Sequence, residues 1–241
     1  MDRMIYLSMA GAKATMQRQE TLANNLANVS TVGFRAELAA FRAVPVEGSG
    51  ASTRVYALES TPGYDATPGQ VTATGRNLDV AMKGGAWLAV QGLDGTEAYT
   101  RGGSLDVSAE GNLVTTSGLT VLGDGGPIAV PTQNAVSIAP DGTVSATAAN
   151  GRSTSIGKLK LVTPDGPLTR GTDGLFRGAD GDLSADSTAQ VQDGALEGSN
   201  VSAVETMVAM ISAARQFEAQ MKSLSSAEGN DKAAAQLLSV S

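Results

Sequence analysis

The chain has 241 residues, with 17 Lys and Arg against 24 Asp and Glu and a formal net charge of −7. Its length is sufficient to bury a core, but the absence of His and Cys removes the commonest general base, the best soft metal ligand and the thiolate nucleophile. Because the basic residues are scattered singly in an acidic chain, nucleic acid and anionic lipid are disfavoured as partners.

The first 33 residues are predicted to form an amphipathic helix. Mostly apolar side chains recur there at alternating steps of four and three residues, which is the heptad period. The pattern stops near Gly33, which we expect to adopt the left-handed conformation of a helix C-cap. The predicted seam consists of Ile5, Met9, Ala12, Met16, Gln19, Ala23 and Leu26.

No targeting or membrane segment is predicted. The opening residues lack the unbroken apolar run of a secretory signal, because Ser8, Gly11 and Lys13 interrupt it. No later stretch approaches the length of apolar residues that a membrane span needs. We therefore expect neither a cleaved signal peptide nor direct membrane insertion.

The middle of the chain is predicted to be β-structure. Residues 34–72, rich in Gly, Ser, Thr and Pro from Val46 onward, are expected to be an extended linker or irregular strands. In residues 73–197 short apolar runs alternate with turn pairs such as Asp141-Gly142 and Asn150-Gly151, the pattern of an all-β sandwich or irregular barrel. The apolar runs are Leu78–Met82, Ala86–Val90, Ala98–Thr100, Leu113–Thr115, Leu119–Leu122, Ile156 and Leu159–Val162.

A second amphipathic helix is predicted over residues 198–241. Ser199 or Asn200 is its expected N-cap, and Glu205 lies early enough to favour the positive end of the helix dipole. Gly229-Asn230-Asp231 is expected to interrupt it. Its apolar face consists of Val201, Val204, Val208, Ile211, Ala214, Phe217, Met221 and Leu224.

The two terminal helices have apolar faces too long to be left in water. We therefore expect them to pack on one another or on neighbouring subunits, as a discontinuous coiled-coil-like assembly domain formed by residues 1–33 and 198–241. With the central β-domain, the predicted fold class is α+β. The predicted assembly interface consists of Ile5, Met9, Ala12, Met16, Ala23, Leu26, Val204, Val208, Ile211, Phe217, Met221 and Leu224.

An acidic segment late in the β-region has the alternating oxygen ligands with which a calcium loop opens: Asp180, Asp182, Ser184 and Asp186. The match fails because Ala185 stands where the sharp-turn Gly belongs and Val191 where the bidentate Glu belongs. The Gly-rich run at residues 123–126 leads into Pro127 rather than a helix, so it is no phosphate loop. We predict no catalytic, metal or cofactor site.

Several motifs resemble the flagellar rod and hook protein family. The N-terminal signature is Ala23-Asn24-Asn25-Leu26-Ala27-Asn28, followed by Val29-Ser30-Thr31-Val32-Gly33-Phe34-Arg35. The resemblance continues through Tyr99-Thr100-Arg101-Gly102-Gly103 and closes with Leu196-Glu197-Gly198-Ser199-Asn200-Val201. The opening Met1-Asp2-Arg3-Met4-Ile5-Tyr6 and the short length are most similar to the proximal-rod subfamily.

This resemblance implies a structural subunit of the flagellar basal-body rod, and no enzyme. It also implies export through the flagellum's own type III apparatus and assembly in the periplasm with itself and other rod subunits. Polymerisation through the terminal helices would then transmit torque from motor to hook.

Three alternatives stay open at this stage. The first is another axial subunit of the family, such as a distal-rod or hook protein. The second is a secreted β-rich binding module, although such a module gains little from two long apolar helices and usually exposes more aromatic side chains than a chain with one Trp. The third is an enzyme that uses Ser-Lys or paired carboxylates, which would need converging polar groups in a pocket.

Overall fold

The structure is a computed structural model that describes residues 2–45, 55–131, 134–179 and 181–239. The chain folds into two compact units. The helical unit comprises Met1–Val29, Ala36–Asp65 and Val201–Ser241, and the β-rich unit comprises Ser30–Arg35 and Ala66–Asn200. The predicted α+β class is confirmed, because two terminal helices flank a central β-rich region.

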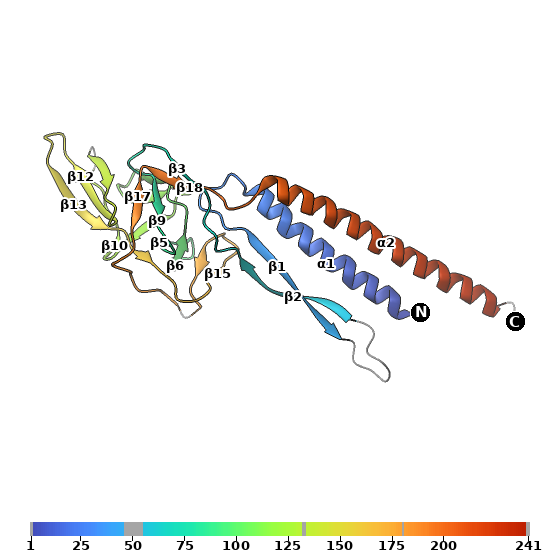
Figure 1. Cartoon of the computed structure of the whole chain (residues 1–241). Helices are drawn as coiled ribbons and strands as arrows, with labels where there is room; N and C mark the ends of the chain where they lie inside the picture. Colours follow the sequence, from blue (N-terminus) through green and yellow to red (C-terminus); the bar gives the residue numbers. More distant parts are fainter. Residues whose placement is uncertain (1, 46–54, 132–133, 180, 240–241) are drawn as a thin grey trace. The chain divides into compact units, whose positions relative to one another are not determined.

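Two helices and a pair of strands build the helical unit. Helix α1 (Asp2–Ala27) and helix α2 (Ala203–Ser239) lie side by side (Figure 1). Strands β1 (Glu37–Pro45) and β2 (Val55–Tyr64) pair antiparallel, with a register shift between Leu38 and Ala40, and both strands contact α1. This ribbon lies in the segment predicted as linker or irregular strands, of which residues 46–54 lie outside the described residues.

The predicted role of Gly33 as a helix cap was wrong. Helix α1 ends at Ala27, where the Asn28 N–H donates to the carbonyls of Asn24 and Asn25 at 3.2 Å each. Gly33 has the expected positive φ of 70° but belongs to the β-rich unit. A Cβ at this position would lie 2.2 Å from the carbonyl carbon of Arg101, so Gly33 is required for a close backbone approach.

Helix α2 begins later than predicted, so Ser199 and Asn200 are not its N-cap. Ser202 precedes the helix, and the Glu205 N–H donates to its Oγ at 3.4 Å. Ser202 and Glu205 have the spacing of a capping box, and Glu205 lies in the first turn as predicted. The Asn200 side chain instead donates from Nδ2 to the Thr67 carbonyl at 3.0 Å.

The predicted break at Gly229-Asn230-Asp231 is also wrong, because α2 continues without interruption to Ser239. A glycine inside a helix is unfavourable by only about 1 kcal/mol relative to Ala. The flanking residues, which include Ala227 and Ala233–Ala235, favour the helix strongly enough to continue through it.

Every strand pair in the β-rich unit is antiparallel. The largest sheet has the order β15-β16-β6-β5-β9-β8-β7, with β10 on β9 and β14 on β5, and smaller sheets are β11-β12-β13, β17-β4 and β18-β3. The strands are β3 (Val71–Ala73), β4 (Val80–Met82), β5 (Trp87–Gln91), β6 (Glu97–Thr100), β7 (Leu105–Val107), β8 (Leu113–Thr115), β9 (Thr120–Gly123), β10 (Gly126–Pro127), β11 (Ala135–Ile138), β12 (Thr143–Thr147), β13 (Ser153–Lys158), β14 (Leu161–Val162), β15 (Thr169–Arg170), β16 (Phe176–Arg177), β17 (Val191–Asp193) and β18 (Ala195–Glu197).

The predicted apolar runs all contribute strands, and the predicted turn glycines Gly142 and Gly151 have φ values of 84° and 78°. Strand β12 is one of several strands that lie outside the predicted runs. It alternates buried Val144 and Ala146 with polar neighbours, and this short pattern is too weak in apolar content to be recognised from sequence.

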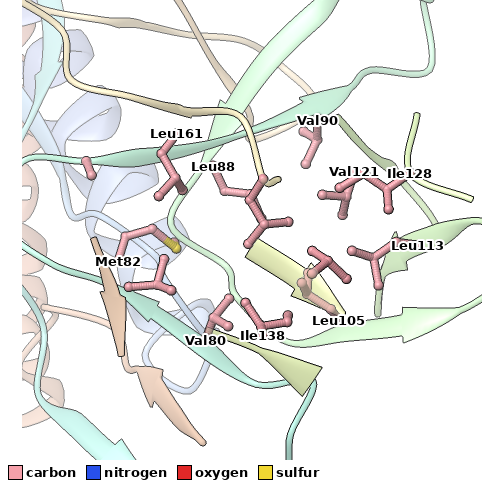
Figure 2. Packing of buried hydrophobic residues seen from close by; sticks show 14 of the residues in the cluster. Val80, Met82, Leu88, Val90, Leu105, Leu113, Val121, Ile128, Ile138 and Leu161 are labelled. Atoms are coloured by element: carbon pink, nitrogen blue, oxygen red, sulfur yellow. The ribbon is translucent and has the colours of Figure 1, made fainter. Parts of the chain in front are cut away.

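The core of the β-rich unit is aliphatic. Figure 2 shows branched side chains from several strands converging in it, among them the fully buried Leu88, Leu105 and Leu113. Its single Trp lies beside an aromatic partner, with the Trp87 and Phe176 ring centroids 4.7 Å apart. This packing fixes the strands of the β-rich unit, including β18, which carries the buried Glu197.

Candidate assembly interface

The most buried side chains of helices α1 and α2 are small or polar. Ser8, Ala12 and Thr15 of α1 are buried, as are Ala213 and Ala227 of α2. Two cross-helix contacts define an antiparallel register. The Ser8 Oγ lies 3.4 Å from the Ser223 Oγ, and a Cβ added to Gly11 would lie 3.0 Å from the Gln220 Cδ. The most buried positions of this contact are thus occupied by small and polar side chains, and Phe217 and Leu224 are half-buried on the same face of α2.

Several large apolar side chains of both helices are exposed to solvent. On α1, Met9 is 54% exposed and Met16 is 49% exposed. On α2, the first turns carry an exposed cluster in which Val204 reaches 72% and Ile211 reaches 56%. We call this set the α2 patch; it consists of Val204, Met207, Val208 and Ile211.

The structure places the residues of the predicted interface in three environments. Ala12 is buried against the partner helix. The half-buried members are Ile5, Leu26, Phe217 and Leu224, and the exposed ones are Met9, Met16, Ala23, Val204, Val208, Ile211 and Met221. The sequence seam on α1 thus mixes residues that face α2 with residues that face outward.

The paired asparagines of the N-terminal signature have different roles. Asn25 is buried, its Nδ2 donates to the Glu37 carbonyl at 2.9 Å, and its Oδ1 accepts from the Glu37 N–H at 2.8 Å. It therefore holds the end of α1 against the start of β1. Asn24 and Ala27 are exposed, Leu26 is half-buried, and Asn28 donates from Nδ2 to the Asn24 carbonyl at 2.9 Å.

The end of the signature is held within the β-rich unit. Phe34 is buried, and the guanidinium carbon of Arg170 lies 4.5 Å from the centroid of its ring. The Gly33 N–H donates to the Glu197 carbonyl at 2.7 Å, and the Asn200 N–H donates to the Phe34 carbonyl at 3.3 Å. Gly33 and Phe34 thus fix the segment that follows α1.

Sequence reasoning assigned no role to the buried charges nearby. The Glu197 carboxylate is almost fully buried and pairs with Arg35 at 2.6 Å and with Arg101. Burial lowers the pKa of Arg101, and the adjacent Glu197 carboxylate opposes that shift. The resemblance motifs contain both Arg101 and Glu197, but a separation of 96 residues gives no local signal that the two charges pair.

No cluster of metal-ligating side chains is found in the part of the chain that the structure describes. Within the helical unit a polar cavity of about 280 Å³ is lined by Gln17, Glu20, Thr21, Asn24 and Glu37. Over the same residues, no three acidic side chains gather as a metal site, and neither helix has the length and apolarity of a membrane span. Asp180 of the rejected calcium loop lies outside the described residues.

Family profiles match three parts of the chain. Residues 5–35 match the profile described as "Flagella basal body rod protein". Residues 81–146 match "Flagellar hook protein FlgE/F/G D1 domain", and residues 192–237 match "Flagellar basal body rod FlgEFG protein C-terminal". The terminal matches cover the signature and most of α2.

Similar proteins extend over the whole chain. The flagellar basal-body rod protein FlgF of Escherichia coli (strain K12) is 49% identical over 252 residues, covering 100% of both chains. FlgF of Salmonella typhimurium is 47% identical over 254 residues, again covering 100% of both. The flagellar basal-body rod protein FlgG of Bacillus subtilis (strain 168) is 32% identical and covers 95% of this chain and 96% of its own.

Proposed function

Because the chain belongs to the flagellar basal-body rod protein family, of the proximal-rod type, we propose that it polymerises through its terminal helices as a structural subunit of the rod. Its function is mechanical: a packed column of subunits passes torque from the motor towards the hook. Stiffness comes from close packing of side chains between subunits.

The observation that carries this proposal is the outward position of the α2 patch. Val204, Val208 and Ile211 are exposed on a helix whose opposite face already packs against α1. Burying a large aliphatic side chain is worth about 1.5–3 kcal/mol, so several such residues provide a strong drive for association. The patch and the exposed Met9 and Met16 lie on different helices, and contacts between different faces of successive subunits generate an open filament.

The proposed partners and location follow from membership of the rod protein family. We place the protein in the periplasmic rod of the basal body, in contact with itself and with other rod subunits. We further propose that it arrives through the flagellar type III export apparatus. Helices without a packing partner are marginal by themselves, so they can pass unfolded through a narrow channel and become ordered on assembly.

Charge introduced at the α2 patch tests the proposal. Ile211→Asp is expected to abolish incorporation into purified basal bodies and swimming, because it places a carboxylate on a face that must lose water. Gln216→Asp, an exposed helix position outside the patch, is the matched control and should assemble. Normal incorporation of the Ile211→Asp protein would contradict the proposal, as would loss of its monomer fold by circular dichroism.

A further inference from the structure

Glu197, at the end of β18, binds three other stretches of the β-rich unit. Its carbonyl oxygen accepts from the Gly33 N–H at 2.7 Å. Its Oε1 accepts from the Gly69 N–H at 2.9 Å and from Arg35 Nη2 at 2.6 Å. Its Oε2 accepts from Arg101 Nε at 2.8 Å. One fully buried residue thus joins two arginines and two backbone donors.

Two of these stretches, together with the stretch that contains Glu197 itself, are those by which the chain passes from one unit to the other. Residues 30–35, 66–70 and 196–200 each begin or end at a boundary of the β-rich unit. Backbone bonds also connect them, because the Gly198 N–H donates to the Gln70 carbonyl at 2.9 Å and the Asn200 N–H to the Phe34 carbonyl. Every described passage between the units therefore leads to the surroundings of Glu197.

The two arginines are held unequally. Arg101 also donates from Nη1 to the Gly84 carbonyl at 2.9 Å and from Nη2 to the Met82 carbonyl at 3.0 Å. Arg35 is 3% exposed, yet its Nε and Nη1 have no acceptor among the residues that the structure describes. Buried donors without acceptors are unfavourable. Arg101 is therefore the fixed partner of Glu197, and Arg35 is the weakly held one.

We propose that Glu197 is a force-transmitting junction, through which tension on the terminal segments enters the β-rich unit. Its contact with Arg35 is the first to separate under load. This inference rests on the proposed mechanical function. Tension on α1 reaches the β-rich unit at residues 30–35, and tension on α2 reaches it at Asn200. Both paths meet at Glu197 before they reach the aliphatic core.

Pulling the full chain by its two ends in an optical trap tests the junction. In the wild type, the loop between Arg35 and Glu197 should be released in one step of about 550 Å, at roughly 3.4 Å per extended residue. Glu197→Gln keeps the shape and removes the charge, and it should lower the mean force of that step to roughly half, since one partner of a buried charge network is lost. Arg35→Met should also lower the force of that step, because it removes one of the two arginines that bind the Glu197 carboxylate.

Glu97→Gln is the matched control. Glu97 pairs with Lys160 Nζ at 2.7 Å in the same unit, and its hydrogen bonds and ion pair lie outside residues 30–35, 66–70 and 196–200. This variant should keep the wild-type force. Equal lowering by Glu97→Gln and Glu197→Gln, or wild-type force for Arg35→Met, would overturn the inference. If the Glu197→Gln variant does not fold, the force measured for the Arg35→Met variant tests the inference by itself. The measurement uses isolated chains, so a result that overturns this inference is distinguishable from a failure of the chain to assemble into the rod.

Discussion

Asn25 and Glu37 exchange two hydrogen bonds, in which one side-chain amide binds both the N–H and the carbonyl of the first residue of β1. Asn25→Ala would remove both bonds and leave these backbone groups without their amide partner, which lowers the free energy of unfolding by about 1–3 kcal/mol. Chemical denaturation of the full chain, followed by helical circular dichroism, measures this loss.

Asn24→Ala is the natural comparison for that variant, because Asn24 is exposed one residue earlier on the same helix. Its effect on stability should stay within about 0.5 kcal/mol. Equal effects of the two variants would show that the buried position of Asn25 carries no special contribution.

Deletion of residues 1–30 should leave the β-rich unit folded but abolish incorporation into the rod and motility. The truncated chain keeps Gly33, Phe34 and Arg35, which dock within that unit. Deletion of residues 1–35 removes these contacts and should lower the thermal midpoint by about 5 °C or more. Swimming cells that carry only the shorter deletion would refute the assembly role of α1.

Gly11→Leu should weaken the contact between α1 and α2. A Cβ alone would already lie 3.0 Å from Gln220 Cδ, and a leucine reaches further into the same space. Overpacking of this kind lowers the free energy of unfolding by about 1–3 kcal/mol. Gln220→Ala should restore much of the loss, and a double-mutant cycle measures the coupling between the two positions. Additive effects would contradict a direct contact.

Stability of the β-rich unit should fall as the pH rises from the ordinary tyrosine pKa of 10.0 to about 12. Burial raises the pKa of Tyr99 to about 12, and hydrogen bonding to Glu97 and its charge act in the same direction. The folded state therefore holds the phenol proton more tightly than the unfolded state, so its contribution is complete below the ordinary pKa of 10.0 and is lost as the pH rises through about 12.

The thermal midpoint, measured at several pH values between 10.0 and about 12, should fall as the pH rises. In the Tyr99→Phe variant this fall should be smaller. Ultraviolet titration of the native chain should show one of its 4 tyrosines ionising last, at a pH of about 12. If all of them ionise together near the ordinary value, the Tyr99 hydroxyl is not shielded as described.

Local pattern was enough to predict the main elements and the family. Heptad spacing predicts both terminal helices, and short apolar runs with Asx-Gly turns predict the strands, because each signal is carried by neighbours along the chain. The ends of the helices were predicted less well. Gly33 has the expected left-handed backbone, but the approach of Arg101 requires it, and that approach is invisible to local pattern.

The inward face of each helix and the role of Glu197 emerged only from the folded molecule. Ser8, Ala12 and Thr15 are buried while Met9 and Met16 face outward, because helix contact is set by the fit of two surfaces and not by the hydrophobicity of one. Glu197 and Arg101 are 96 residues apart. Opposite charges at that separation carry no signal in a sequence, because only the folded core brings them together and removes the water that would otherwise screen them.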